Sequence, residues 1–116
     1  MHCLKIEEAQ KVLCSRYGAA FVSTPPDDKI GFATATAGLK PINGLRHPLT
    51  AGTSGWYIWC GESFLEAADF FEPQHASHIY EILPDASHLF GLPPGYRFLL
   101  AGDYLDVWYD EKLLSV

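Results

Sequence analysis

The amino-acid sequence predicts an α+β fold, with a mostly antiparallel sheet of about five strands and two main helices packed on it. Two segments place apolar residues at helical spacing, several shorter ones are rich in β-branched and aromatic residues, and Gly102-Asp103 is a typical hairpin turn. A chain of 116 residues is long enough to bury a core without staples, so we expect one domain over residues 1–116.

The two helices are predicted from apolar spacing and from their end signals. The first, over Lys5–Arg16, carries four apolar residues on one stripe, and Gly18 offers a C-cap. The second, over Gln74–Leu83, has a similar apolar side and stops at Pro84; a short turn over 86–90 follows. The stripe of the first helix consists of Ile6, Ala9, Val12 and Leu13.

The first half of the chain contains two short predicted strands and one long connection. Ala19–Ser23 and Ile30–Thr36 are apolar or alternating segments separated by a loop rich in proline and aspartate. Ala37–Ser54 has no convincing period, and a connection of this length is usually functional or mobile. It holds Arg46 and His47, a local cationic spot in an acidic chain.

The segment Thr53–Glu62 is predicted to be the central strand, because it holds two of the three tryptophans between breaks at Ser-Gly and Gly-Glu. Both of its sides are apolar, so the strand is either covered on both faces or presents one face to a partner. Trp56, Ile58 and Cys60 point to one face, and Tyr57 and Trp59 point to the other.

The second half of the chain supplies two acidic features. A loose helical turn over Glu62–Glu72 would gather Glu62, Glu66 and Asp69 into one acidic face. The predicted strands Tyr96–Ala101 and Tyr104–Asp110 form a hairpin. In its second strand Tyr104, Asp106, Trp108 and Asp110 share a face, a mixed aromatic and acidic surface.

Composition excludes several functional classes. The formal net charge of -6 leaves no basic footprint for nucleic acid and favours a basic partner. Three cysteines without a CxxC pattern argue against a disulfide framework, and no apolar run is long enough to span a membrane. We therefore expect a cytoplasmic protein, with its oligomeric state left open.

Catalytic chemistry is the minority interpretation. His75 and His78 share a helical side and could chelate a metal with Cys60 or His88, but further ligands at recognisable spacing are absent. Cys60 alternates with Trp56 and Ile58, which is typical of a buried, inert thiol rather than a nucleophile. Without a phosphate-binding loop, a GxSxG elbow or an HExxH motif, we expect no enzyme, no metal and no cofactor.

Several blocks, in order and in spacing, resemble the bacterial immunity protein 33 family. They cover most of the chain between residues 20 and 110, and the first helix contributes little. The resemblance implies a small α+β domain of a bacterial polymorphic toxin system that binds and neutralises a toxin in the cytosol, and it brings no catalytic residues. The blocks are Gly44–Pro48, Thr53–Trp59 with Gly61-Glu62, Asp69–Phe71, Leu92–Leu99 and Asp106–Asp110.

The leading hypothesis is therefore a non-enzymatic immunity protein that binds a cognate toxin domain. If that toxin is a nuclease, its basic cleft would meet the acidic residues of the candidate surface. The alternative is a small enzyme or ligand-binding domain that uses a cleft under the loop 37–54, with Arg46 as an anion anchor. The predicted partner-binding residues are Arg46, Tyr57, Trp59, Glu62, Glu66, Asp69, Asp106, Trp108 and Asp110.

Overall fold

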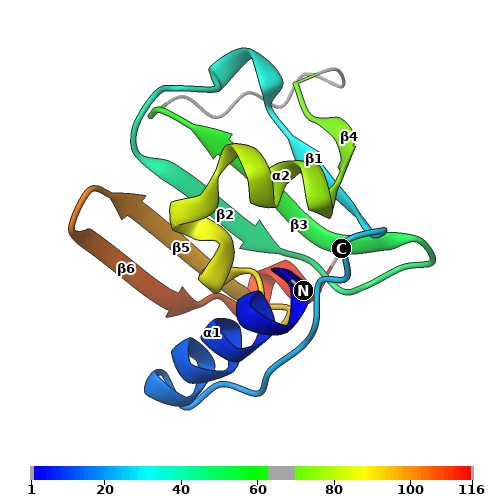
Figure 1. The fold of residues 1–116 in the computed structure, drawn as a ribbon, viewed down its shortest axis with the longest axis vertical. Coiled ribbons are helices and arrows are strands. Elements are labelled where there is room, and N and C mark those ends of the chain that lie inside the picture. Colours follow the sequence, from blue (N-terminus) through cyan, green and yellow to red (C-terminus); the bar gives the residue numbers. More distant parts are fainter. Residues whose placement is uncertain (1, 63–69, 116) are drawn as a thin grey trace.

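The computed structural model describes residues 2–62 and 70–115 and has both of its described α-helices on one face of a six-stranded sheet (Figure 1). The strand order is β4-β1-β3-β2-β5-β6; β1 and β3 run parallel, and every other neighbouring pair is antiparallel. The predicted α+β class is confirmed, and the expected five strands are close to the six observed. The helices are α1 (His2–Arg16) and α2 (Ala76–Ile82), with 3₁₀-helices η1 (Thr34–Thr36), η2 (Pro84–Leu89) and η3 (Glu111–Leu114). The strands are β1 (Lys29–Phe32), β2 (Ile42–Arg46), β3 (Thr53–Cys60), β4 (Glu72–His75), β5 (Tyr96–Ala101) and β6 (Tyr104–Tyr109).

The main hydrophobic core lies between the sheet and the layer formed by α1, α2 and η2 (Figure 1). Trp56, Ile58 and Cys60 of β3 all face this core, as their alternation predicts. The indole ring of Trp56 contacts Phe90 and Phe98 with ring centroids 5.4 and 5.6 Å apart. Burial of several large rings in one layer removes a large apolar area from water.

The inward side of α1 differs from the predicted stripe. Leu13 is buried as expected, but Val12 is 61% exposed and its place is taken by Gln10 and Cys14. The Gln10 amide donates to the carbonyl of Ser87 in η2 at 2.9 Å. The spacing of apolar residues predicts the wrong inward side for α1. The helix packs on η2, whose backbone carbonyls require hydrogen-bond donors, so a polar side chain faces inward.

Residues 19–23 are not a strand, which corrects the prediction for Ala19–Ser23. The N–H of Val22 donates to the carbonyl of Gly91, whereas the carbonyls of Val22 and Ser23 accept from the Arg46 side chain. The backbone groups of this segment thus bond to separate partners rather than to the backbone of one strand. The segment can therefore lie along the core without a neighbouring strand.

Two strands that were not predicted complete the sheet. β2 lies inside the supposed loop 37–54, and its Gly44 faces the core so closely that an added Cβ would lie 2.3 Å from Phe98. β4 contains Pro73 and occupies residues that the apolar spacing assigned to the start of a helix. Glycine and proline are both unfavourable in strands. In β2 the close packing at Gly44 outweighs this preference, and in β4 the edge position makes the proline tolerable.

The other face of the sheet carries a smaller cluster. It contains Leu45, Trp59 and Leu113 of η3, with Phe70 and Phe71 packed against them. The predicted acidic turn over Glu62–Glu72 falls largely on residues 63–69, outside the described part of the chain. Among the described residues, no helix is both long and apolar enough to cross a bilayer.

Candidate partner-binding face

The sheet register lines up one row of side chains across four strands on the side away from α1 and α2. Tyr57 of β3 pairs with Leu45 of β2, and Leu45 pairs with Arg97 of β5. Arg97 in turn pairs with Trp108 of β6. Directly paired residues of neighbouring strands point to the same side of a sheet, so these four residues define what we call the outer face.

A second row lies two residues further along the strands on the same face. Trp59 pairs with Asn43, Asn43 pairs with Leu99, and Leu99 pairs with Asp106. Four predicted partner-binding residues thus come together on the outer face from strands far apart in the sequence. They are Tyr57, Trp59, Asp106 and Trp108.

Exposure divides the outer face into a covered centre and two open sides. Trp59 and Leu45 are 6% and 7% exposed, because they pack in the small cluster with Leu113 of η3, and the Trp59 ring also contacts Phe71 with centroids 6.2 Å apart. Tyr57 and Trp108 are 37% and 38% exposed, and both retain ring surface that another protein could contact. Trp59, which was predicted as a partner-binding residue, is therefore buried and leaves little surface for a partner to contact.

The two exposed rings are held in place by neighbours. Tyr57 contacts His47 and Phe71, with ring centroids 5.3 and 5.2 Å apart. The Arg97 guanidinium lies 5.6 Å from the Trp108 ring centroid. Rings that are already oriented lose little conformational entropy on binding, which favours their use as anchors.

Acidic residues border the Trp108 side of the outer face. Asp110 Oδ2 lies 3.4 Å from Arg97 Nη1, so this carboxylate is partly neutralised. Asp106 is exposed and, among the described residues, has no cationic partner. An unpaired carboxylate beside an exposed indole is suited to a partner that brings its own lysine or arginine.

The remaining predicted acidic residues are less informative. Glu62 is exposed just beyond the end of β3. Glu66 and Asp69 lie outside the described residues, so their relation to the outer face stays a prediction.

Arg46 lies on the core side, which corrects its assignment to the partner-binding surface. Its side chain is fully buried and donates to four backbone carbonyls, and its guanidinium also lies 5.5 Å from the Trp56 ring centroid. Burial lowers the pKa of Arg46 to about 10, so the side chain stays charged at neutral pH. The four hydrogen bonds are to Ser54 at 2.8 Å, Val22 at 2.8 Å, Leu92 at 2.7 Å and Ser23 at 3.0 Å.

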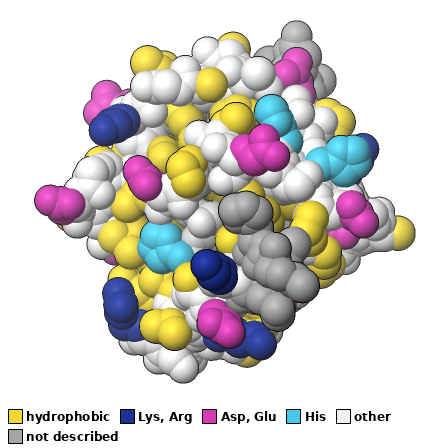
Figure 2. Space-filling model, viewed as in Figure 1, with side chains coloured by type: hydrophobic (Ala, Val, Ile, Leu, Met, Phe, Trp, Pro, Cys, Tyr) yellow, Lys and Arg dark blue, Asp and Glu magenta, His cyan; other side chains and the backbone are white. Residues whose placement is uncertain are grey.

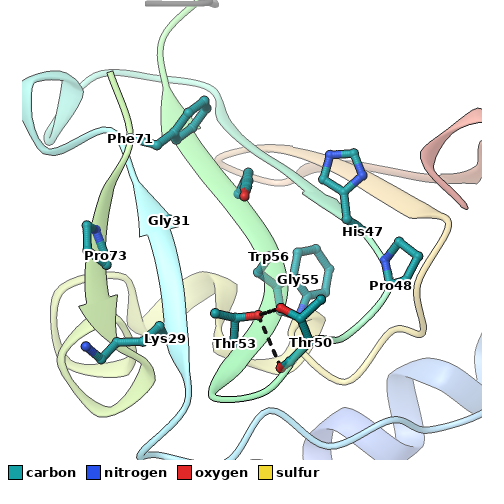
Figure 3. A pocket seen from close by; sticks show the side chains of 11 residues that line it. Lys29, Gly31, His47, Pro48, Thr50, Thr53, Gly55, Trp56, Phe71 and Pro73 are labelled. Carbon is teal, nitrogen blue, oxygen red and sulfur yellow. Dashed lines mark hydrogen bonds between the residues drawn. The ribbon is translucent and has the colours of Figure 1, made fainter. Parts of the chain in front are cut away.

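A pocket of about 500 Å³ lies beside the turn between β2 and β3 (Figure 3). Its basic side chains are Lys29 and His47, which stand on opposite sides of the hollow (Figure 3). Arg46 does not line it, and no carboxylate does so among the residues that the structure describes. The convergent arginine, histidine and carboxylate that a ligand-binding cleft would need are therefore not brought together here.

The other candidate chemistry is not assembled either. Within the described residues, no three histidine, cysteine or acidic side chains are grouped to hold a metal ion. His75 ends β4, His78 lies in α2, and Cys60 is 1% exposed on the core face. Burial raises the pKa of the Cys60 thiol, which opposes formation of a nucleophilic thiolate.

Arg97 and Tyr104 lie on the outer face but were not among the predicted contacts. Arg97 supports Trp108, and Tyr104, two residues before Asp106 on the same side of β6, is 60% exposed. The alternation of side chains along β6 is enough to predict from the sequence that Tyr104 and Trp108 share a face. The role of Arg97 could not be predicted in this way, because it depends on cross-strand pairing.

The helical side of the molecule offers no comparable arrangement. Figure 2 shows acidic, basic and hydrophobic side chains interspersed over its described surface. Without a gathering of one charge around exposed rings, this side is the weaker candidate for an acidic docking surface.

Comparison with protein families gives one match, to a model described as the Imm33-like domain, over residues 9–110. This confirms the resemblance stated from the sequence blocks and extends it into α1. Comparisons with curated proteins and with solved structures found no match.

Proposed function

Because the chain belongs to the Imm33-like family, we propose that it is a non-enzymatic immunity protein that neutralises a bacterial toxin domain by direct binding. The observation that carries the proposal is the cross-strand register, which gathers Tyr57, Asp106 and Trp108 on the outer face. Immobilised aromatic rings beside an unpaired carboxylate are the usual components of an interface hot spot and its charged rim.

The proposed partner is a toxin domain with a basic surface, such as a nuclease that binds phosphates. The chain has a net charge of -6, and Asp106 has no cationic neighbour among the described residues. Opposite charges would accelerate encounter, and the exposed rings of Tyr57 and Trp108 would slow dissociation. Glu62 and Asp110 would lie at the rim.

We further propose that the protein acts in the cytoplasm. Cys14 and Cys60 are free thiols, which suits a reducing compartment. Neutralisation by occlusion of the toxin requires no catalytic residue of the immunity protein.

The test uses the toxin domain encoded beside this gene, in co-expression and in a binding assay with an inactivated form. Trp108→Ala should weaken binding by about 30-fold, as expected for a hot-spot ring. Asp106→Asn should slow association several-fold and reduce its salt dependence. Cells carrying either variant should show weaker protection than cells with the wild type.

Matched controls lie on other parts of the molecule. Tyr17, at the end of α1, is 37% exposed, close to the 38% of Trp108, and Asp27 is an exposed aspartate in a loop. Tyr17→Ala and Asp27→Asn should bind the toxin as the wild type does. Wild-type affinity in both folded outer-face variants would reject the proposed surface, and a wild type that neither binds nor protects would reject neutralisation by binding.

A further inference from the structure

The two edges of the sheet are unequally protected against pairing with another strand. β4, at one edge, has four residues and contains Pro73, which lacks an N–H. β6, at the opposite edge, pairs with β5 through six consecutive residues without a bulge, and its sequence YLDVWY contains no proline, glycine or lysine (Figure 1). Proteins usually protect an edge by shortness, proline, lysine or a bulge, and β6 has none of these.

The hydrogen-bond pattern identifies which backbone groups of β6 point outward. The N–H of Asp110 donates to the carbonyl of Gly95 at 2.7 Å. In an antiparallel pair, bonded and non-bonded residue pairs alternate, so Trp108, Asp106 and Tyr104 bond to β5. The N–H and C=O groups of Leu105, Val107 and Tyr109 consequently face away from the sheet, and among the described residues no strand lies beside them.

Exposed side chains flank this free edge on both faces. Tyr104 and Trp108 are 60% and 38% exposed on the outer face, and Tyr109 is 52% exposed on the other. A strand added to β6 would thus find ring surface for alternate side chains on either side of its backbone. This combination of free main-chain groups and side-chain contacts is how strand addition achieves affinity and specificity.

We propose that β6 accepts an extended, basic segment of the toxin domain as a seventh strand, an inference that rests on the proposed function. Asp106 of this strand has no cationic partner in the described part of the chain, and Asp103, Asp110 and Glu111 lie immediately beyond its ends. A lysine or arginine of the incoming segment opposite Asp106 would form a favourable cross-strand pair.

Charge also selects against a second copy of this chain as the occupant. β6 could pair in antiparallel orientation with β6 of another copy in registers centred on Asp106, Val107 or Trp108. In each of these registers, Asp106 lies opposite or diagonal to a carboxylate of the other copy. These carboxylates are Asp106 and Asp110 of the second copy. Like charges at such positions destabilise strand pairing, and two chains of net charge -6 repel each other as well.

Amide hydrogen exchange of the full chain, alone and with the inactivated toxin domain encoded beside this gene, tests the proposal directly. The outward amides of Leu105, Val107 and Tyr109 should exchange about 100-fold more slowly in the complex. The amides of Asp106 and Trp108 already bond to β5 and serve as internal references. Toxin binding without slower exchange at the three outward amides overturns strand addition and leaves the proposed function intact.

A proline variant provides a second test. Val107→Pro removes an outward N–H without removing a hydrogen bond to β5, and proline is tolerated at such edge positions. It should weaken toxin binding by about 100-fold, whereas Val107→Ala, which keeps the N–H, should stay within about threefold of the wild type. A folded Val107→Pro variant with wild-type affinity overturns the proposal.

Two further outcomes identify other occupants. Slower exchange of the outward amides that depends on protein concentration without toxin would assign the edge to a second copy and overturn the proposal. Failure of the wild type to bind the toxin at all would reject the proposed function, and the strand-addition inference with it.

Discussion

Arg46 is the only charged residue among the fully buried side chains that the structure describes. Its five N–H groups form a rigid fork, and four of its hydrogen bonds connect carbonyls of three separate chain segments. The Arg46 side chain thereby connects three segments: residues 22–23, the start of β3 and the segment after η2. Carbonyl dipoles and the Trp56 ring surround its charge, and among the described residues no carboxylate forms an ion pair with it.

Replacement of Arg46 should therefore cost stability rather than affinity. Arg46→Met leaves buried carbonyls without donors and should lower the free energy of unfolding by about 3 kcal/mol or more. Urea unfolding followed by tryptophan fluorescence measures this change. Lys40 is exposed, so Lys40→Met should change stability by less than about 0.5 kcal/mol. An unchanged unfolding midpoint in Arg46→Met would contradict the structural role.

At the scale of elements, β2 shows how a central strand can escape recognition. It pairs with both β3 and β5, yet its sequence INGLR contains a glycine and ends in a charged residue. Gly44 faces Phe98 and Ile58, where any side chain would overlap the core rings. The glycine is therefore a packing requirement, although in the sequence it indicates a loop.

Two glycine substitutions in different strands of the sheet test this packing. Gly44→Ala would place a Cβ 2.3 Å from Phe98 Cε2 and should destabilise the fold by about 2 kcal/mol. Gly31 also lies within a strand, but a Cβ there would meet Tyr57 at 3.4 Å, an ordinary contact. Thermal unfolding of both variants should show a clear loss only for Gly44→Ala. Equal midpoints would mean that the Phe98 ring moves aside without cost.

At the scale of the whole molecule, the sheet has one large core and one small one. The helical side buries most of the large rings, whereas the outer face is covered by η3 and by Phe70 and Phe71 over a limited area. This asymmetry leaves Tyr57 and Trp108 accessible on either side of η3 and makes the outer face available to a partner.

The unequal cores predict unequal costs of truncation. Phe98→Ala in the large core should lower the free energy of unfolding by about 4 kcal/mol, and Leu113→Ala in the small cluster by about 2 kcal/mol. Leu114 is the matched control, because it lies in the same 3₁₀-helix and is 42% exposed. Chemical denaturation of the three variants should rank them in that order. If Leu113→Ala matched Leu114→Ala, η3 would not stabilise the outer face.

The sequence by itself determined the α+β class, the faces of β3, and the hairpin of β5 and β6. These features depend on local patterns: alternation of side chains along a strand, and a two-residue turn of glycine and aspartate. Local patterns also placed Tyr57 and Trp59 on one face of their strand and Asp106 and Trp108 on one face of theirs.

Only the tertiary structure decided how these faces meet. β2 and β5 lie between β3 and β6, and their register, which no local pattern encodes, brings Tyr57 and Trp108 into one row. Burial was decided in the same way: Arg46 lies inside because distant carbonyls converge on it, and Trp59 is buried in a cluster that includes Phe71 and Leu113. Both outcomes depend on contacts between residues far apart in the chain, whose energies appear only when the whole sheet is assembled.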